Sequence, residues 1–214
     1  MLGDKIVVKE HHRRAAGQVY KQIRDSILKK DTPAAVTVAG ESGSGKSEIG
    51  SEIARFFKDN NGLNCIIFAQ DDYFRLPPKS NDAARRKNIN RVGTGEVKLD
   101  LLDEHIKNIK SGKKTNFEKP LIDYGKDNIL TEKVNGEGVD LIVAEGTYTT
   151  KLKNADHRVF IDRTYKDTYE HRKERARDEL DDYMNKILRI EHEIISAHKR
   201  KADIVISRDY RVVD

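Results

Sequence analysis

Residues 40–47 read Gly-Glu-Ser-Gly-Ser-Gly-Lys-Ser, which is the pattern G-x-x-x-x-G-K-S. Glycines let a backbone bend so that several N–H groups point at one anion. The positive end of a following helix strengthens that attraction. In such a loop Lys46 reaches the β- and γ-phosphates of a nucleotide, and the Ser47 hydroxyl ligates Mg²⁺. The segment therefore predicts a site for a nucleoside triphosphate and Mg²⁺, formed by Gly40, Glu41, Ser42, Gly43, Ser44, Gly45, Lys46 and Ser47.

This pattern predicts a phosphate-binding loop only when a strand precedes it and a helix follows it. The valine-rich run 35–39 indicates a buried strand, and the four-residue spacing of Ile49, Ile53 and Phe57 indicates a helix. The required context is therefore present, which a chance occurrence would lack. The loop alone does not distinguish a kinase from a nucleotide-dependent switch or motor.

Acidic residues follow two other predicted strands. Asp71 and Asp72 come after the apolar run 64–69, and Glu145 comes after 141–144. The carboxyl ends of parallel strands face the ligand crevice, so these carboxylates are expected near the γ-phosphate. There, an aspartate can accept a proton from an attacking hydroxyl, and both kinds of residue can hold Mg²⁺. The alternatives are an aspartate that caps a turn and a glutamate with a structural hydrogen bond.

Four arginines are concentrated in residues 163–178: Arg163, Arg172, Arg175 and Arg177. Planar guanidinium groups neutralise the charge that develops on a transferring phosphoryl group. Arg172 and Arg175 are three residues apart and would share one face of a helix. The alternative is a solvated helix, because acidic residues lie between the arginines.

The rest of the chain alternates between strand and helix patterns. Strands separated by helices predict an α/β fold with a mostly parallel sheet and helices on both faces. Two weaker extended runs flank Tyr124-Gly125 and could pair as a hairpin. The expected strands are 35–39, 64–69, 141–144, 158–161 and 203–206; the expected helices include 13–30, 99–110 and the charged region 165–199; the hairpin is expected at 115–134.

Length and composition limit the class of protein. The 214 residues suit one domain, 1–214, in which residues 1–32 form an N-terminal helical extension. Hydrophobic and charged residues each make up 36%, and no apolar run approaches the ~20 residues of a membrane span. No secretory signal is visible at the N-terminus. The single cysteine excludes an internal disulfide, so we expect a protein of the reducing cytoplasm without a membrane partner.

The chain has a net charge of +5, and the segment 75–98 by itself has the same net charge. It contains seven basic residues and two acidic ones, Asp82 and Glu96. This balance suits an anionic small molecule as well as nucleic acid. The sequence has no signature of an RNA- or DNA-binding fold, so a nucleic-acid partner is not expected. We expect 75–98 to be a basic loop, and the alternative to an anion-binding role is that the loop is only solvated and flexible.

In the order of its motifs, the chain resembles the uridine kinase/phosphoribulokinase-like family of P-loop kinases. The resemblance covers roughly residues 35–208. It rests on the loop GESGSGKS at 40–47, QDDYF at 70–74, PLID at 120–123, AEGTY at 144–148, VFID at 159–162 with its arginine-rich helix, and KRKADIVISRD at 199–209.

The resemblance implies a five-stranded parallel sheet, a hairpin at the acceptor site and a lid with helices at 163–200. It makes Asp71 the catalytic base, Lys46 the γ-phosphate lysine, and Ser47, Asp71 and Glu145 the Mg²⁺ shell. Further implied roles are catalytic for Arg172 and Arg175; nucleotide-binding for Arg177 and Arg208; and acceptor-binding for Asp72, Tyr73, Asp123 and Tyr124.

The chain departs from the uridine kinase pattern where the acceptor binds. The family's His-Pro-Asp-Ala-Phe-Asp stretch corresponds to 92–100, which keeps only Asp100; its hairpin histidine corresponds to Asp127; and its Arg-Gly lid turn is replaced by 181–183. Losing buried hydrogen-bond partners changes specificity strongly. We therefore expect a uridine kinase-like phosphotransferase that uses ATP and Mg²⁺ and acts on a small hydroxyl-bearing molecule. The alternatives are a kinase for a sugar, phosphosugar or vitamin precursor, and a regulatory NTPase. Assembly into a homo-oligomer stays open.

Overall fold

The computed structural model describes residues 2, 6–175 and 181–213, and in the first lid helix the side chains of His171, Glu174 and Arg175 lie outside the description. Within these ranges the central sheet has the order β2-β5-β1-β6-β7-β8. The first five strands in that order are parallel, as expected, and β8 adds a short antiparallel edge. The strands are β1 Ala34–Gly40, β2 Cys65–Ala69, β5 Leu141–Glu145, β6 His157–Ile161, β7 Ile204–Ile206 and β8 Val212–Val213.

The position of each strand in the sheet decides its burial. Every residue of β1 and β5 is buried, because these strands are internal and covered on both faces. The prediction that 64–69 forms a buried strand is only half right. β2 forms there but lies at the edge of the sheet, where Ile67 is 42% exposed.

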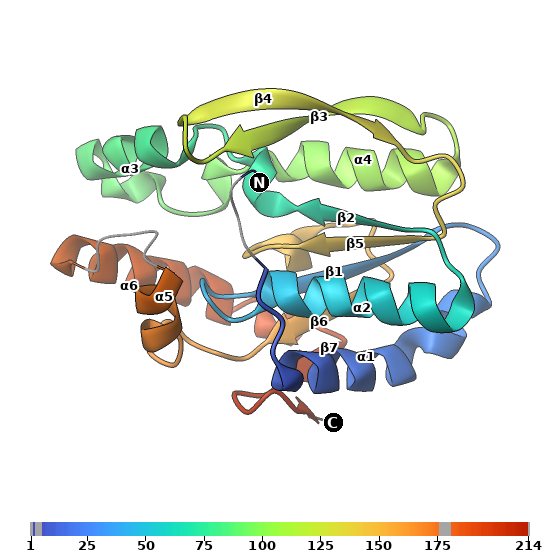
Figure 1. The fold of residues 1–214 in the computed structure, drawn as a ribbon. Helices are drawn as coiled ribbons and strands as arrows, with labels where there is room; N and C mark the ends of the chain where they lie inside the picture. The colour runs from blue at the N-terminus through green and yellow to red at the C-terminus, as the bar shows by residue number, and fades with distance from the viewer. Residues whose placement is uncertain (1, 3–5, 176–180, 214) are drawn as a thin grey trace.

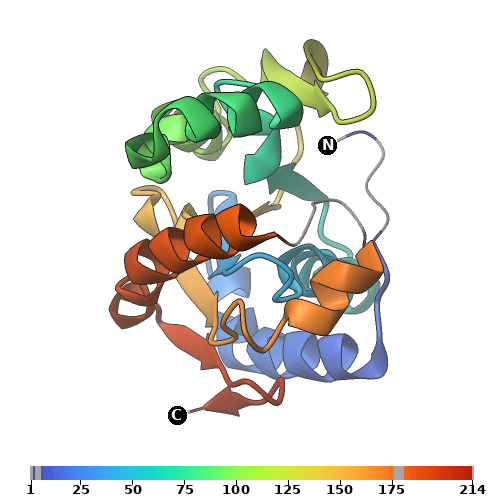
Figure 2. The same ribbon diagram turned by 90° about the vertical axis from the view of Figure 1, so that its left-hand side faces the viewer.

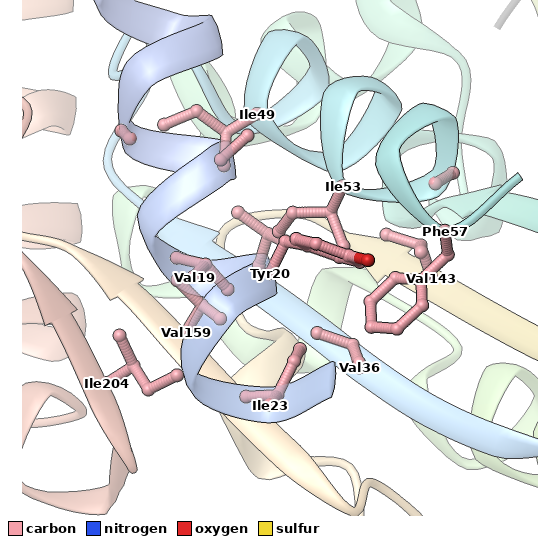
Figure 3. Packing of buried hydrophobic residues seen from close by; sticks show 14 of the residues in the cluster. Val19, Tyr20, Ile23, Val36, Ile49, Ile53, Phe57, Val143, Val159 and Ile204 are labelled. Atoms are coloured by element: carbon pink, nitrogen blue, oxygen red, sulfur yellow. The ribbon is translucent and has the colours of Figure 1, made fainter. Parts of the chain in front are cut away.

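Two helices, α1 Glu10–Leu28 and α2 Lys46–Asn61, cover one face of the sheet. The apolar stripe of α1 at Ala15, Val19, Ile23 and Ile27 is buried there, so the N-terminal helix is part of the core. Figure 3 shows the layer: Val19, Tyr20 and Ile23 from α1; Ile49, Ile53 and Phe57 from α2; and Val36, Val143, Val159 and Ile204 from the strands.

The opposite face is covered by α4 Leu99–Ser111, by α6 Asp182–Ser196 and by the hairpin of β3 Asn116–Asp123 and β4 Asn128–Asn135. The hairpin confirms the pairing predicted for 115–134. Its two strands lie above β2 and α4 in Figure 1. Phe117 and Val134 bring it into the core of this face, together with Ile106 and Ile195.

Two predicted segments differ in the structure. The basic segment 75–98 is not a loop: it forms α3 Pro78–Lys87 and two 3₁₀ turns, Ile89–Arg91 and Thr94–Glu96. Pro78 at the first helical position favours the start of α3. Within the region expected to be one charged helix, 165–199, the structure describes two helices, α5 Tyr169–Arg175 and α6, whose first turn is capped by the Asp181 side chain.

The carboxyl ends of the parallel strands point to one side of the molecule, the left in Figure 1, where α3, α5 and α6 gather. Among the described residues, no helix is long and apolar enough to cross a membrane. Cys65 is a free, half-buried thiol, and burial raises its pKa to about 11. It is therefore a thiol of low reactivity.

Candidate active site

A cavity of about 460 Å³ lies at the carboxyl ends of the strands. One wall is the 40–47 loop, and the other walls are α3, the hairpin turn and α6. Figure 2, which looks onto this side, shows α3 above α6. The position agrees with the rule that ligands of open parallel sheets bind at the strands' carboxyl ends.

The backbone of the 40–47 loop is tightly curved, and side chains pack directly against it. Gly43 and Gly45 have φ of +75° and +91°, values that L side chains rarely adopt. A Cβ on Gly43 would lie 2.9 Å from Cγ of Arg172, so the lid arginine packs directly on the loop. Lys46 Nζ donates to the backbone oxygen of Glu41 at 3.0 Å, which holds the lysine over the loop. Lys46 and Ser47 both line the cavity.

The remaining loop residues support this shape. Ser42 lines the cavity, whereas Gly40 ends β1 with φ +154°. Glu41 turns away from the cavity: its carboxylate accepts from the Tyr165 N–H at 2.5 Å and bonds His192 Nδ1 at 2.6 Å. Ser44 Oγ is buried and has no hydrogen-bond partner among the described residues. An orphaned hydroxyl inside a phosphate loop fits a site that gains a ligand.

Ser47, Asp71 and Glu145, the residues predicted to hold Mg²⁺, all line the cavity. Ser47 Oγ donates to Glu145 Oε1 at 3.1 Å. Burial and then the nearby Asp71 charge raise the pKa of Glu145 to about 7. Among the described residues there is no group of three or more His, Cys, Asp or Glu side chains fit to hold a metal. Two carboxylates and one hydroxyl suit Mg²⁺, which keeps waters and shares phosphate oxygens.

The two aspartates after β2 point in different directions. They lie in the 3₁₀ helix Gln70–Tyr73 (η1). Asp71 lines the cavity, and its carboxylate makes no hydrogen bond with the described residues. Asp72 is 3% exposed and faces the hairpin, where it pairs with Lys119 at 3.0 Å and accepts from the Ile122 N–H at 3.1 Å. Asp72 therefore ties the hairpin to η1 and does not line the cavity.

The other residues implied for acceptor binding are also divided. Tyr73 is fully buried, with its hydroxyl 3.0 Å from Nδ1 of His105. Asp123 accepts from the Lys126 N–H within the hairpin turn and is not part of the cavity wall. Tyr124 does line the cavity. Of the four, the structure brings only Tyr124 to the site.

The lid arginines can be placed only in part. Arg172 lines the cavity and is 8% exposed, and its Nη2 donates to the Tyr165 backbone oxygen at 2.8 Å. The side chain of Arg175 and all of Arg177 lie outside the described residues. Arg208 is 74% exposed, pairs with Asp167 at 3.1 Å and is not in the cavity wall.

A charge network between α3 and α6 also forms part of the cavity wall, and no sequence pattern predicted it. Arg85 bonds Glu96 through Nε at 2.6 Å and through Nη2 at 2.8 Å, and it bonds Glu191 through Nη2 at 2.9 Å. Arg85 and Glu191 line the cavity, and Glu96 lies buried behind them. Burial raises the pKa of Glu191, and Arg85 opposes that shift. The basic composition of 75–98 indicated cations here but not their carboxylate partners.

Asp127 plays a structural part. It sits in the hairpin turn with φ +49° and accepts from the N–H groups of Lys79 and Ser80 at 2.7 and 3.1 Å. These are orphan donors of the first turn of α3. Where the uridine kinase pattern has a histidine, this chain therefore has a carboxylate that caps α3 and fixes the hairpin against it.

Solved structures share the fold. A possible uridine kinase from Bacillus stearothermophilus superposes with a TM-score of 0.62 at 19% identity, covering 90% of this chain and 97% of that one. D-glycerate 3-kinase from Cryptococcus neoformans gives 0.61 at 16%, covering 96% and 98%. At these identities the likeness establishes the fold alone.

Curated relatives include a bifunctional alpha-galactosidase/sucrose kinase from Mediterraneibacter gnavus, 23% identical over 94% of this chain. A uridine kinase from Ureaplasma urealyticum is 34% identical over 61% of this chain, and one from Clostridium novyi is 29% identical over 81%. The chain spans 23% of the length of the first protein, 63% of the second and 86% of the third.

The family model described as "Phosphoribulokinase / Uridine kinase family" matches residues 35–209, which include the loop, η1, the hairpin and α6. Its related proteins are kinases that use ATP and a hydroxyl acceptor. The matched range covers most of the chain, and the chain belongs to the phosphoribulokinase/uridine kinase family of P-loop kinases.

Proposed function

We propose that this protein is an ATP- and Mg²⁺-dependent kinase that transfers the γ-phosphate to a hydroxyl group of a small molecule. One observation carries the proposal. Lys46, Ser47, Asp71 and Glu145 line a single cavity, and its far wall, made of α3, Tyr124 and α6, leaves room for a second substrate.

The phosphate end of the cavity would hold and neutralise the triphosphate. The loop's N–H groups and Lys46 bind phosphate oxygens, and Arg172, packed on Gly43, adds a planar cation beside them. Ser47 and Glu145 are the residues that would hold Mg²⁺, with Asp71 adjacent. When bound, the ion supplies charge neutralisation for the phosphoryl group.

Asp71 would act as the general base. Its carboxylate lines the cavity and is not engaged by the described residues, so it can accept the proton of the acceptor hydroxyl. The acceptor oxygen then forms the bond to the γ-phosphorus while the bond to the β–γ bridging oxygen breaks, and ADP leaves. This role of Asp71 distinguishes the proposed kinase from a nucleotide-dependent switch, because a switch transfers phosphate to no acceptor molecule.

The first experiment measures ADP release from ATP and Mg²⁺ alone, and then with a panel of nucleosides, sugars, phosphosugars and vitamin precursors. We expect release to depend on an acceptor. Release at the same rate without any acceptor contradicts the proposal and favours a regulatory NTPase. Among the relatives, the uridine kinases and the sucrose kinase justify including both acceptor classes.

The second experiment is Asp71→Asn. We expect turnover to fall by ~10²-fold or more, the usual range for a general base, while ATP binding stays within a factor of about two. Binding is measured by calorimetry and turnover by coupled ADP release. Asp31→Asn, at an exposed residue outside the cavity, is the control. Unchanged turnover in Asp71→Asn removes this residue from the role.

A further inference from the structure

The cations of α3 that line the cavity are largely neutralised within the protein. Arg85 is held by Glu96 and Glu191, and Arg86 bonds Asp82 at 2.8 Å and lies over the Tyr183 ring. Arg85 is thus paired with Glu96 and Glu191, and Arg86 is paired with Asp82 and, at 3.7 Å, with Asp181. Lys79 is the third cation of α3 in the wall. This end of the cavity offers little net charge to a second anion, although the basic composition of 75–98 suggested one.

The Arg85–Glu191 pair keeps unused hydrogen-bonding groups. Arg85 uses Nε and Nη2 for its carboxylate partners, and Nη1 makes no hydrogen bond with the described residues. Glu191 binds Arg85 through Oε1, and its Oε2 receives none from them. The two side chains are only 12% and 15% exposed, and both line the cavity. A donor and an acceptor are thus held side by side on a rigid pair.

A hydroxyl group matches such a pair because it both donates and accepts, and two neighbouring hydroxyls match it twice. A phosphate or carboxylate only accepts, so it would place negative charge against Glu191. Apolar and aromatic side chains also line this end, with Phe74, Leu76, Ile122 and Ile187 in the wall beside Tyr124. Such surfaces pack against the carbon skeleton of a bound molecule and exclude water.

We propose that the acceptor is a neutral molecule with vicinal hydroxyls, recognised by Glu191 and Arg85 as a specificity-determining pair across the cleft between α6 and α3. The inference rests on the proposed kinase function and adds the class of its substrate. A free sugar or polyol and the ribose of a nucleoside share this chemistry, and the experiment separates them.

The test uses the full chain with ATP and Mg²⁺. The acceptors are D-ribose, D-fructose, D-glucose and glycerol; uridine and cytidine; the deoxy analogues 2-deoxy-D-ribose, 2-deoxy-D-glucose and 2′-deoxyuridine; and ribose 5-phosphate and fructose 6-phosphate. We expect neutral diol acceptors to be phosphorylated and the matching deoxy analogue to lose roughly 10- to 100-fold in kcat/KM, the value of a hydrogen bond to a charged group. Preference for the sugars or for the nucleosides identifies the source of the diol.

Glu191→Gln tests the pair directly. It keeps the shape of the side chain and removes its charge, so we expect the KM for the diol acceptor to rise roughly 10-fold or more and the penalty for the deoxy analogue to shrink to about 3-fold. ATP affinity and the thermal unfolding midpoint show whether the variant is folded. Glu193→Gln, at an exposed position two residues along α6, is the matched control and should behave as wild type.

The outcomes separate this inference from the proposed function. Faster turnover with the phosphorylated sugars than with any neutral acceptor overturns the inference and leaves the kinase function in place. An unchanged deoxy penalty in a folded Glu191→Gln variant does the same. ATP turnover that no acceptor stimulates overturns both.

Discussion

The nucleotide end and the acceptor end of the cavity differ in how their residues are brought together. The loop, Lys46 and Ser47 belong to one continuous strand–loop–helix segment, 34–61. The acceptor end joins α3, the hairpin turn and α6, and its Arg85–Glu191 pair links residues 106 positions apart. The first end depends on backbone geometry within a short segment, and the second depends on ion pairs between elements that must first be packed. Changes at the two ends should therefore have different consequences.

The largest effect is expected from Lys46→Met. Among the described residues, the lysine side chain bonds only the Glu41 backbone oxygen, so its loss should lower turnover by ~10³-fold and change the unfolding free energy by less than about 0.5 kcal/mol. Steady-state kinetics and urea denaturation measure the two quantities. Lys58→Met, at an exposed lysine of the same helix, is the control. A large loss of stability in Lys46→Met would contradict the expected difference between the two ends of the cavity.

Asp72→Asn should show the opposite behaviour. It leaves the buried Lys119 with Glu132 as its one carboxylate partner in the described part of the chain, so we expect the unfolding free energy to fall by about 3 kcal/mol. ATP affinity should stay within about twofold, because Asp72 does not line the cavity. Urea denaturation and calorimetry check this. Glu118→Gln, exposed on the same strand β3, is the control. Normal stability with weakened ATP binding would show that Asp72 belongs to the nucleotide site.

The smallest effect expected is a pH dependence of stability at the hairpin. Burial lowers the pKa of His105, stacked on Phe117, from 6.5 to about 4. Between these pH values the unfolded chain takes up a proton that the folded chain does not. The contribution of neutral His105 to the unfolding free energy is therefore fully present above pH 6.5. It is lost as the pH drops towards 4, and the loss is about 2 kcal/mol.

Urea denaturation at pH 7 and pH 4.5 measures this loss. His105→Gln should reduce the difference between the two pH values, although His198, whose pKa burial also lowers to about 4, keeps its own share. An equal difference in wild type and variant would show that His105 is not the group responsible.

The sequence predicted an element correctly where the residues of that element alone specify it, for example through the spacing of its apolar residues. The helix predicted at 13–30 forms at Glu10–Leu28, because its apolar stripe needs only a sheet to cover it. The strand–loop–helix of the phosphate site and the hairpin pairing are confirmed. The prediction that the basic segment 75–98 is a loop was wrong, because α3 forms there. α3 is stabilised partly by Asp127, which lies 47 residues beyond Ser80 and cannot be identified as a helix cap from its neighbours.

The amino-acid sequence by itself determined that a phosphate loop follows an internal strand, and that acidic residues end the neighbouring strands. Both follow from short-range rules: glycine conformations, helix termini and the direction of parallel strands. Only the tertiary structure decided that Asp71 and not Asp72 lines the cavity, and that Arg85 is neutralised by Glu96 and Glu191. Those assignments depend on which charges are buried together, and burial is a property of packed elements rather than of any one segment.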